Sequence, residues 1–140
     1  MVDSRLTEDP AREVLEALVA SVIANNEDEA AFQGLSLLDK LVSNIVKNPT
    51  EDKYKKFKKT NPKIAGTVLS LQGGINDLIL AMGFASNPEH FEFTGEMTNL
   101  KKGSKAMEKA IEPMQVARMT PEERSKHELL QRQKAAYKTQ

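Results

Sequence analysis

Residues 44–84 read NIVKNPTEDKYKKFKKTNPKIAGTVLSLQGGINDLILAMGF, and this stretch decides the fold. It begins at the end of a long apolar helix pattern and closes on the tripeptide MGF at 82–84, where a glycine stop is followed by a large aromatic residue. Between these ends lies the densest run of lysines in the chain, with Tyr54 and Phe57 set into it. The stretch therefore predicts a shallow, basic, partly aromatic pocket.

Turns that contain proline divide this stretch into short helices. The turn at 48–50 predicts the start of a short helix over 51–59. Asn61 followed by proline repeats this pattern of a capping residue and a first-turn proline, and it predicts a second short helix. If the first helix continues to residue 61, then Tyr54, Lys58 and Asn61 lie on one side of it, because they are four and three residues apart.

Two helices are predicted before this stretch. An Asp-Pro pair at 9–10 starts the first, and we expect residues 1–8 to be a flexible N-terminus. The second helix is the longest and runs from about residue 26 to Lys47. Asn44 lies on the edge of its apolar stripe, at a place where the pattern would accept an apolar residue. That stripe consists of Ala31, Leu35, Leu38, Val42 and Ile45.

A helix and a small β element are predicted next. The pair Gly73-Gly74 breaks the chain before a helix over 75–82, and Gly83 is placed to end that helix in the left-handed conformation. The segment Phe91-Glu92-Phe93 alternates apolar and polar residues, which is typical of a strand. We predict that residues 68–71 form its partner strand.

The remaining chain is predicted to be helical. One helix covers about 102–112, and Pro113 is expected to end it. The sequence TPEE from Thr120 is a capping box that starts a last, highly charged helix. The fold class predicted is α+β and predominantly helical. Its parts are a flexible N-terminus over 1–8, one domain over 9–113 and a charged helical extension over 114–140.

The composition excludes several classes of function. The chain of 140 residues has no cysteine, so thiolate catalysis, disulfides and zinc–thiolate sites are excluded. Its two histidines, His90 and His127, lie far apart in sequence, and no glycine-rich phosphate loop is present. No apolar run is long enough to span a bilayer. We therefore expect a protein without catalytic activity, cofactor, metal or membrane contact, located in the cytoplasm, with the nucleus as an alternative.

The lysine run has a specific chemistry. Residues 53–63 carry six lysines and no acid, whereas the formal net charge of the whole chain is zero. A run of this kind is often only a solvated helix face, but here Tyr54 offers an aromatic platform, and Asn44 and Asn61 offer amides that both donate and accept hydrogen bonds. This set fits a short, extended, acidic peptide with one apolar or aromatic anchor, which Lys53 and Lys55 would steer as an electrostatic rim.

Nucleic acid is the alternative ligand for the lysine run. A nucleic-acid-binding module would be expected to carry more arginine, more aromatic residues and a positive net charge. The sequence alone therefore leaves a basic, helical nucleic-acid-binding module as an alternative function. A steep dependence of binding on salt, without dependence on Tyr54, would favour it.

The order and spacing of these motifs resemble the PUB domain, also called PUG, which was first noticed in peptide:N-glycanases. The resemblance rests on Asn44 before an Asn-Pro turn, a Lys-Tyr pair at 53–54, Lys58 three residues before Asn61, and a helix that ends in MGF. It covers about residues 27–113. It implies a compact helical domain with a small antiparallel β-sheet.

The resemblance also implies a function. PUB domains bind the extreme C-terminal tail of the hexameric AAA+ ATPase valosin-containing protein, and that tail is acidic and ends in a leucine-tyrosine anchor. The chain would then be a non-catalytic adaptor that connects the ATPase to ubiquitin–proteasome and ERAD-type processing, and we expect it to act as a monomer. The family pattern carries over to a peptide-binding set of Asn44, Tyr54, Lys58, Asn61, Gly83 and Phe84.

Two positions depart from the family pattern. Lys58 stands where relatives often have arginine, and lysine cannot make the planar bidentate contact, so a carboxylate would be held less rigidly. The pair at 73–74 stands where relatives often have a single glycine, which predicts a local change of turn. Since some relatives sit beside a catalytic transglutaminase-like domain, a fragment of an enzyme is a further alternative, although this chain lacks the nucleophilic cysteine.

Each residue of the peptide-binding set also has a purely structural explanation. Asn44 could cap a neighbouring helix, and Tyr54 could be mainly a core residue with an exposed hydroxyl. Asn61 fits a helix N-cap whatever else it does. Gly83 and Phe84 would serve as helix stop and core plug even without a ligand.

Overall fold

The computed structural model describes the backbone of residues 10–139 and the side chains of residues 10–133. The predicted flexible N-terminus and the Asp9 cap lie outside the described residues. The elements in chain order are α1 (Pro10–Ala24), α2 (Asp28–Lys47), the 3-10 helix η2 (Asp52–Lys55), β1 (Lys56–Lys58), α3 (Pro62–Thr67), α4 (Ile75–Ala81), β2 (Phe84–Ser86), β3 (His90–Phe93), α5 (Met97–Ala117) and α6 (Pro121–Thr139).

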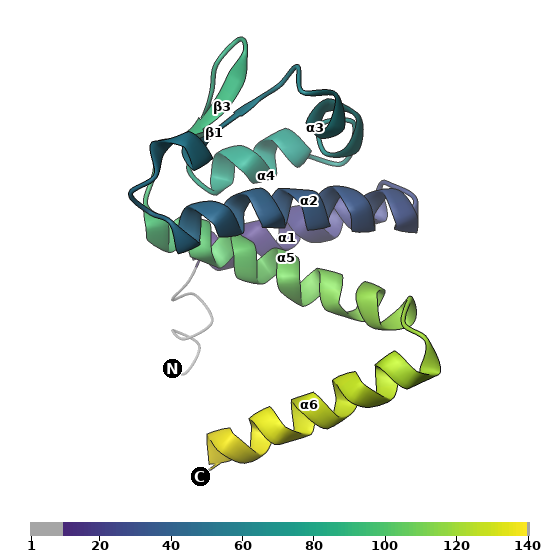
Figure 1. The fold of residues 1–140 in the computed structure, drawn as a ribbon. Helices are drawn as coiled ribbons and strands as arrows, with labels where there is room; N and C mark the ends of the chain where they lie inside the picture. The colour runs from purple at the N-terminus through teal and green to yellow at the C-terminus, as the bar shows by residue number, and fades with distance from the viewer. Residues whose placement is uncertain (1–9, 140) are drawn as a thin grey trace, which may run out of the picture.

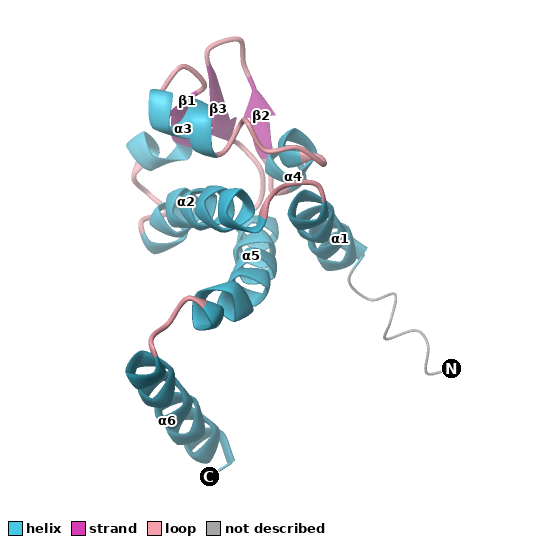
Figure 2. Ribbon diagram, turned by 90° about the vertical axis from the view of Figure 1, so that its right-hand side faces the viewer, coloured by secondary structure: helices cyan, strands magenta, loops and turns pink. Residues whose placement is uncertain are grey.

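Three long helices carry the fold. α1 and α2 both pack on α5, and α4 lies between α1 and the small sheet (Figures 1 and 2). The sheet sits at one end of the body, and α6 leaves from the opposite end (Figure 2). The predicted fold class, α+β and mostly helical with a small antiparallel sheet, is confirmed.

The core follows the apolar stripes of these helices. The predicted stripe of α2 is buried from Ala31 to Ile45, and α1 and α5 add side chains such as Val22 and Met107, which have no exposed surface. Burying one such side chain contributes about 1.5–3 kcal/mol to the stability of the fold. This tertiary packing, rather than helix propensity, stabilises helices of this length. The buried stripe therefore fixes the position of α2 on the core, and this also fixes where the segment after Lys47 begins.

The sheet has the strand order β1-β3-β2, and both pairs are antiparallel. Phe57 pairs with Phe91, and Phe84 pairs with Phe93, so all four rings lie on the same face of the sheet and are buried. The predicted partner strand at 68–71 is wrong. That segment forms turns after α3, in which Leu69 N–H donates to Ile64 O at 3.0 Å and Leu71 N–H donates to Val68 O at 3.1 Å.

The helix predicted over 51–59 is also wrong beyond Lys55. The chain makes one 3-10 turn and then enters β1, where Phe57 is buried between two exposed lysines. Lysine favours helices, but residues 51–59 carry only two large apolar side chains, Tyr54 and Phe57, which is too short an apolar stripe to hold a nine-residue helix on the core. Pairing with β3 wins because it buries Phe57 against Phe91 at a ring-centroid distance of 5.4 Å.

Pro113 does not end α5, contrary to the prediction, because the helix continues to Ala117. A proline removes one helical hydrogen bond. The end of the helix is fixed by Arg118, whose Nη2 lies 2.8 Å from Asp28 Oδ2 and 2.9 Å from Glu29 Oε1. Its guanidinium carbon also lies 4.2 Å from the ring centroid of Phe32, so the last turn of α5 is tied to the first turns of α2.

Glycine sets two of the predicted breaks. Gly83 has a φ of 110°, which side chains rarely adopt, and its backbone packs so closely on Gly95 that a Cβ at Gly95 would collide with the Gly83 Cα. This conformation ends α4 and directs the chain into β2. The pair Gly73-Gly74 also has positive φ values and separates α3 from α4, as predicted.

The capping box at the start of α6 is confirmed. Thr120 N–H donates to Glu123 Oε1 at 3.0 Å, and Glu123 N–H donates to Thr120 Oγ1 at 3.2 Å. α6 then projects away from the body (Figure 1), with Leu129 and Leu130 about half exposed. The division of the chain at residue 113 stays a prediction. Within the described residues, no helix is long and apolar enough to cross a membrane.

Candidate functional site

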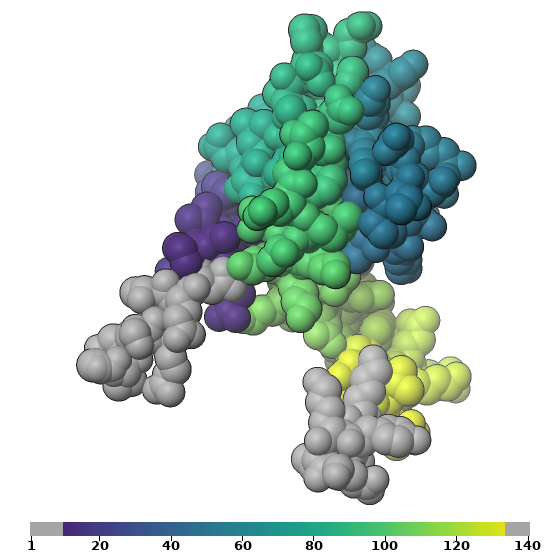
Figure 3. Space-filling model, turned by 90° about the vertical axis from the view of Figure 1, so that its left-hand side faces the viewer, coloured from purple at the N-terminus to yellow at the C-terminus, as the bar shows by residue number. Residues whose placement is uncertain are grey.

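Four of the six predicted peptide-binding residues come from elements that lie together. Asn44 is in the last turn of α2, Tyr54 is in η2, Lys58 ends β1 and Asn61 precedes α3. η2 contacts both α2 and β1, and α3 contacts α2. In Figure 3 this part of the chain, in blue, forms one flank of the body beside the green β3–α5 segment.

Tyr54 provides the aromatic surface of this flank. Its ring is half buried and packs against the hydrophobic core. The Nζ atom of Lys53 lies 5.3 Å from the ring centroid, within the range of a cation–π contact. Tyr54 is therefore both a core residue, as its structural explanation supposes, and a partly exposed platform.

Asn61 has the capping role that its sequence position predicts. Its Oδ1 accepts hydrogen bonds from Lys63 N–H at 3.0 Å and Ile64 N–H at 3.2 Å. Its own N–H donates to Lys58 O at 3.3 Å, so these two residues of the site form one turn. The side chain is exposed, and among the described residues nothing accepts from its Nδ2 amide, which remains able to donate to a ligand.

Asn44 presents a side-chain amide that is not used within the fold. Its backbone oxygen accepts from the N–H of Asn48 at 3.0 Å and from the Asn48 Nδ2 at 3.1 Å. Its half-buried side chain makes no hydrogen bond to any residue in the part of the chain that the structure describes. The structural explanation of Asn44 as a cap for a neighbouring helix therefore finds no support.

The lysines of the rim are partly neutralised. Lys53 Nζ lies 3.9 Å from Glu51 Oε2, and Lys55 Nζ lies 3.6 Å from Asp52 Oδ1. Exposed pairs of this kind contribute only about 0–1 kcal/mol, so they can exchange for a ligand carboxylate. Lys58 is exposed and has no acidic partner among the described residues.

Gly83 and Phe84 lie at a different strand of the sheet than Lys58, which is the strand residue among the other four. They precede and begin β2, on the far side of β3 from β1. Phe84 is 4% exposed, and its ring centroid lies 5.5 Å from those of Phe57 and Phe93. The structure thus gives this pair the roles of helix stop and core plug.

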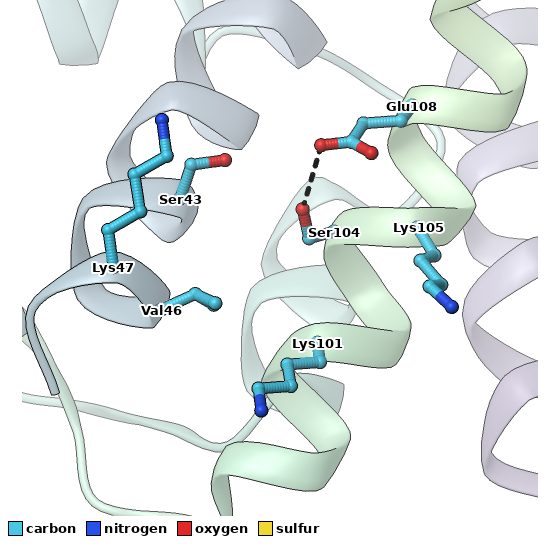
Figure 4. Close-up of a pocket in the computed structure, with 7 residues that line it drawn as sticks. All are labelled: Ser43, Val46, Lys47, Lys101, Ser104, Lys105 and Glu108. Atoms are coloured by element: carbon cyan, nitrogen blue, oxygen red, sulfur yellow. Dashed lines mark hydrogen bonds between the residues drawn. The ribbon is translucent and has the colours of Figure 1, made fainter. Parts of the chain in front are cut away.

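A cavity that the sequence did not reveal lies between α2 and α5 (Figure 4). It measures about 300 Å³ and lies between the last turns of α2 and the first half of α5. The sequence pattern does not indicate this cavity, because the pairing of α2 with α5 depends on tertiary packing. It is lined by Ser43, Val46, Lys47, Lys101, Ser104, Lys105 and Glu108.

A small polar cluster closes one side of this cavity. Ser104 Oγ lies 2.7 Å from Asp39 Oδ1 and 3.3 Å from Glu108 Oε2. Burial raises the pKa of Asp39 from its ordinary 3.8 to about 6, and the nearby Glu108 carboxylate adds to the rise, whereas the Ser104 hydrogen bond opposes it. Among the described residues no group of three His, Asp or Glu could hold a metal ion.

Asp39 makes the stability of the fold depend on pH. The folded protein keeps the Asp39 proton up to about pH 6, whereas the unfolded chain loses it near 3.8, so the contribution is complete below pH 3.8 and is lost as pH rises through 6. The full pKa difference corresponds to about 3 kcal/mol, which screening of the partly exposed carboxyl reduces to about 1 kcal/mol.

We expect Asp39→Asn to raise the free energy of unfolding by about 1 kcal/mol at pH 7.5 and to have a much smaller effect at pH 4. Urea denaturation of both proteins at the two pH values measures this difference. Glu89→Gln, on an exposed turn, is the matched control and should behave alike at both values. If Asp39→Asn changed the stability equally at the two pH values, the assignment would be contradicted.

The comparisons with known proteins fit this structure. A search of curated proteins found no match. The family model of the PUB domain matches residues 28–105, which run from the first residue of α2 into α5 and include η2, α3, α4 and all three strands. Since this match covers more than half of the 140 residues, the chain belongs to the PUB domain family.

Proposed function

We propose that the flank formed by Asn44, Tyr54, Lys58 and Asn61 captures the acidic C-terminal tail of the AAA+ ATPase valosin-containing protein. A PUB domain is a non-catalytic protein-interaction module, and this supports an adaptor role. The main support for binding of this tail is the half-buried ring of Tyr54, which lies on the same flank as the unused amide of Asn44. Such an adaptor would work in ubiquitin–proteasome processing in the cytoplasm or nucleus.

Each residue has a distinct role in this proposal. The tail's leucine-tyrosine anchor packs against Tyr54, where aromatic and apolar area gives most of the binding energy. The amides of Asn44 and Asn61 hold the backbone of the tail. Lys58 meets a carboxylate, and Lys53 and Lys55 exchange their weak pairs with Glu51 and Asp52 for the acidic residues of the tail.

The direct experiment is calorimetric titration of the 140-residue chain with a synthetic acidic peptide that ends in Leu-Tyr. We expect saturable binding with one peptide per chain and a moderate dependence on salt. The same peptide with Ala-Ala in place of Leu-Tyr is the control and should not bind. Absence of binding by the unmutated chain, or equal binding of the control peptide, would overturn the proposal.

Phosphorylation of the anchor tyrosine in the tail should weaken binding. The phosphate adds about two negative charges and bulk to a group that packs on an apolar surface, and this cost exceeds the gain from nearby lysines. We expect the dissociation constant to rise at least about tenfold, which corresponds to about 1.4 kcal/mol. Calorimetry with the phosphorylated and unmodified peptides measures the ratio. Equal affinity of the two peptides would show that the anchor does not enter such a surface.

A further inference from the structure

A second groove extends from Lys59, the residue after β1, to the helix α4. It has a volume of about 410 Å³, within the range of about 300–1,000 Å³ that is usual for ligand sites. Its walls come from the turn after α3, the outer side of α4 and the inner face of the sheet, which lie side by side in Figures 1 and 2. It is lined by Lys59, Leu69, Asn76, Leu80, Ser86 and Phe91.

Leu80 and Leu69 give this groove an apolar character, and the buried Phe91 ring lies at its floor. Leu80 is 44% exposed, although it belongs to the short helix α4 whose other side is the core. Asn76 lies one turn before Leu80 on the same side of α4, and the half-buried Leu69 faces them across the groove. An exposed leucine beside a concave apolar surface indicates an interaction site, whereas an isolated exposed leucine on a convex surface does not.

Lys59 places a positive charge over the apolar floor. Its Nζ lies 4.6 Å from the ring centroid of Phe91 and donates to Ser86 Oγ at 2.7 Å. Both of these partners are neutral, and among the described residues Lys59 has no ion pair. An ammonium has three N–H donors, so this group can bind a carboxylate while it keeps its place over the ring.

We propose that this groove binds an acidic peptide segment of a partner protein, with one leucine-sized side chain against Leu80 and Leu69 and an adjacent carboxylate on Lys59. The charge complementarity selects this occupant, because a half-buried cation without an acidic partner favours an anionic ligand. Asn76 is placed to hold the backbone of the segment. The groove shares no lining residue with the tail-binding flank, and neither proposal requires the other.

The test is an NMR titration of the ¹⁵N-labelled chain with acetyl-Asp-Leu-Asp-amide. We expect amide shifts at Leu69, Asn76, Leu80 and Ser86, and a loss of affinity of about fivefold with acetyl-Asn-Leu-Asn-amide, since an exposed charge pair contributes about 1 kcal/mol. Leu80→Ser should remove the shifts, whereas Leu129→Ser, at a leucine that is even more exposed, should keep them. Lys59→Gln should weaken binding about fivefold, and the exposed Lys40→Gln should not.

Other outcomes would overturn the groove proposal. Sodium acetate alone giving the same shifts would indicate a simple anion site, and shifts that change on dilution of the protein would indicate a second copy of the chain. Shifts confined to Tyr54 and Asn61 would place the tripeptide in the tail-binding flank and leave the proposed function standing. Conversely, groove shifts in a chain that does not bind the Leu-Tyr tail would sink the proposed function and support the groove.

Discussion

Tyr54→Ala is expected to abolish measurable binding of the acidic Leu-Tyr tail. Aromatic anchors at the centre of an interface typically cost about 2 kcal/mol or more when removed, which is about 30-fold in affinity. The half-buried ring of Tyr54 is the aromatic surface of the flank, and the unused amide of Asn44 lies on the neighbouring helix. Calorimetry under the conditions used for the unmutated chain measures the loss.

A matched variant separates binding from folding at this position. Because Tyr54 also packs on the core, Tyr54→Ala should lower stability somewhat, whereas Tyr54→Phe keeps the ring and its packing. We expect Tyr54→Phe to keep the helical circular dichroism and most of the affinity. Equal loss of binding in both variants would show that the ring is not the anchor. Unfolding of Tyr54→Ala at room temperature would favour a purely structural role.

Two substitutions of Asn61 should have different effects, because the residue combines a cap with an amide. Asn61→Ser keeps an oxygen that can accept from Lys63 N–H and Ile64 N–H, so it preserves the cap of α3 and removes only the amide donor. Asn61→Ala removes both, and loss of a cap costs about 1 kcal/mol of stability. We expect both variants to lose tail binding and only Asn61→Ala to lose stability.

Tail titration and urea denaturation together measure the two effects of Asn61. Thr120→Ser is the control, because it keeps the cap of α6, which lies outside the proposed site. Full affinity in Asn61→Ser would mean that the amide does not contact the tail. Equal stability of the alanine and serine variants would mean that the observed cap contributes little.

The long helices could be predicted from the sequence because their apolar stripes repeat over several turns. α1 and α2 start and end close to the predicted residues, and the short helix α4 does so because glycines stand at both of its ends, including the left-handed Gly83. The short elements could not be predicted in the same way. A strand of three residues such as Lys56–Lys58 shows no period of its own, and its pairing with β3 depends on contacts more than thirty residues away in sequence.

The candidate site could be predicted where local chemistry decides it. Asn61 before a proline predicted the observed cap, and Tyr54 within the lysines predicted a partly exposed ring. The position of Phe84 on the edge strand β2, with β3 between it and β1, could not be predicted because it depends on the strand order β1-β3-β2. The groove beside Lys59 and the cavity between α2 and α5 depend in the same way on tertiary packing.

An NMR titration of the ¹⁵N-labelled chain with the acidic Leu-Tyr tail peptide, followed residue by residue, tests the proposed binding site directly. We expect the largest shifts on the amides of Tyr54, Lys58 and Asn61 and on the side-chain amide of Asn44. Shifts at these positions should saturate together with a single dissociation constant. If these four residues showed no shifts, or if the shifts fell on α6 instead, the proposed tail-binding site would be contradicted.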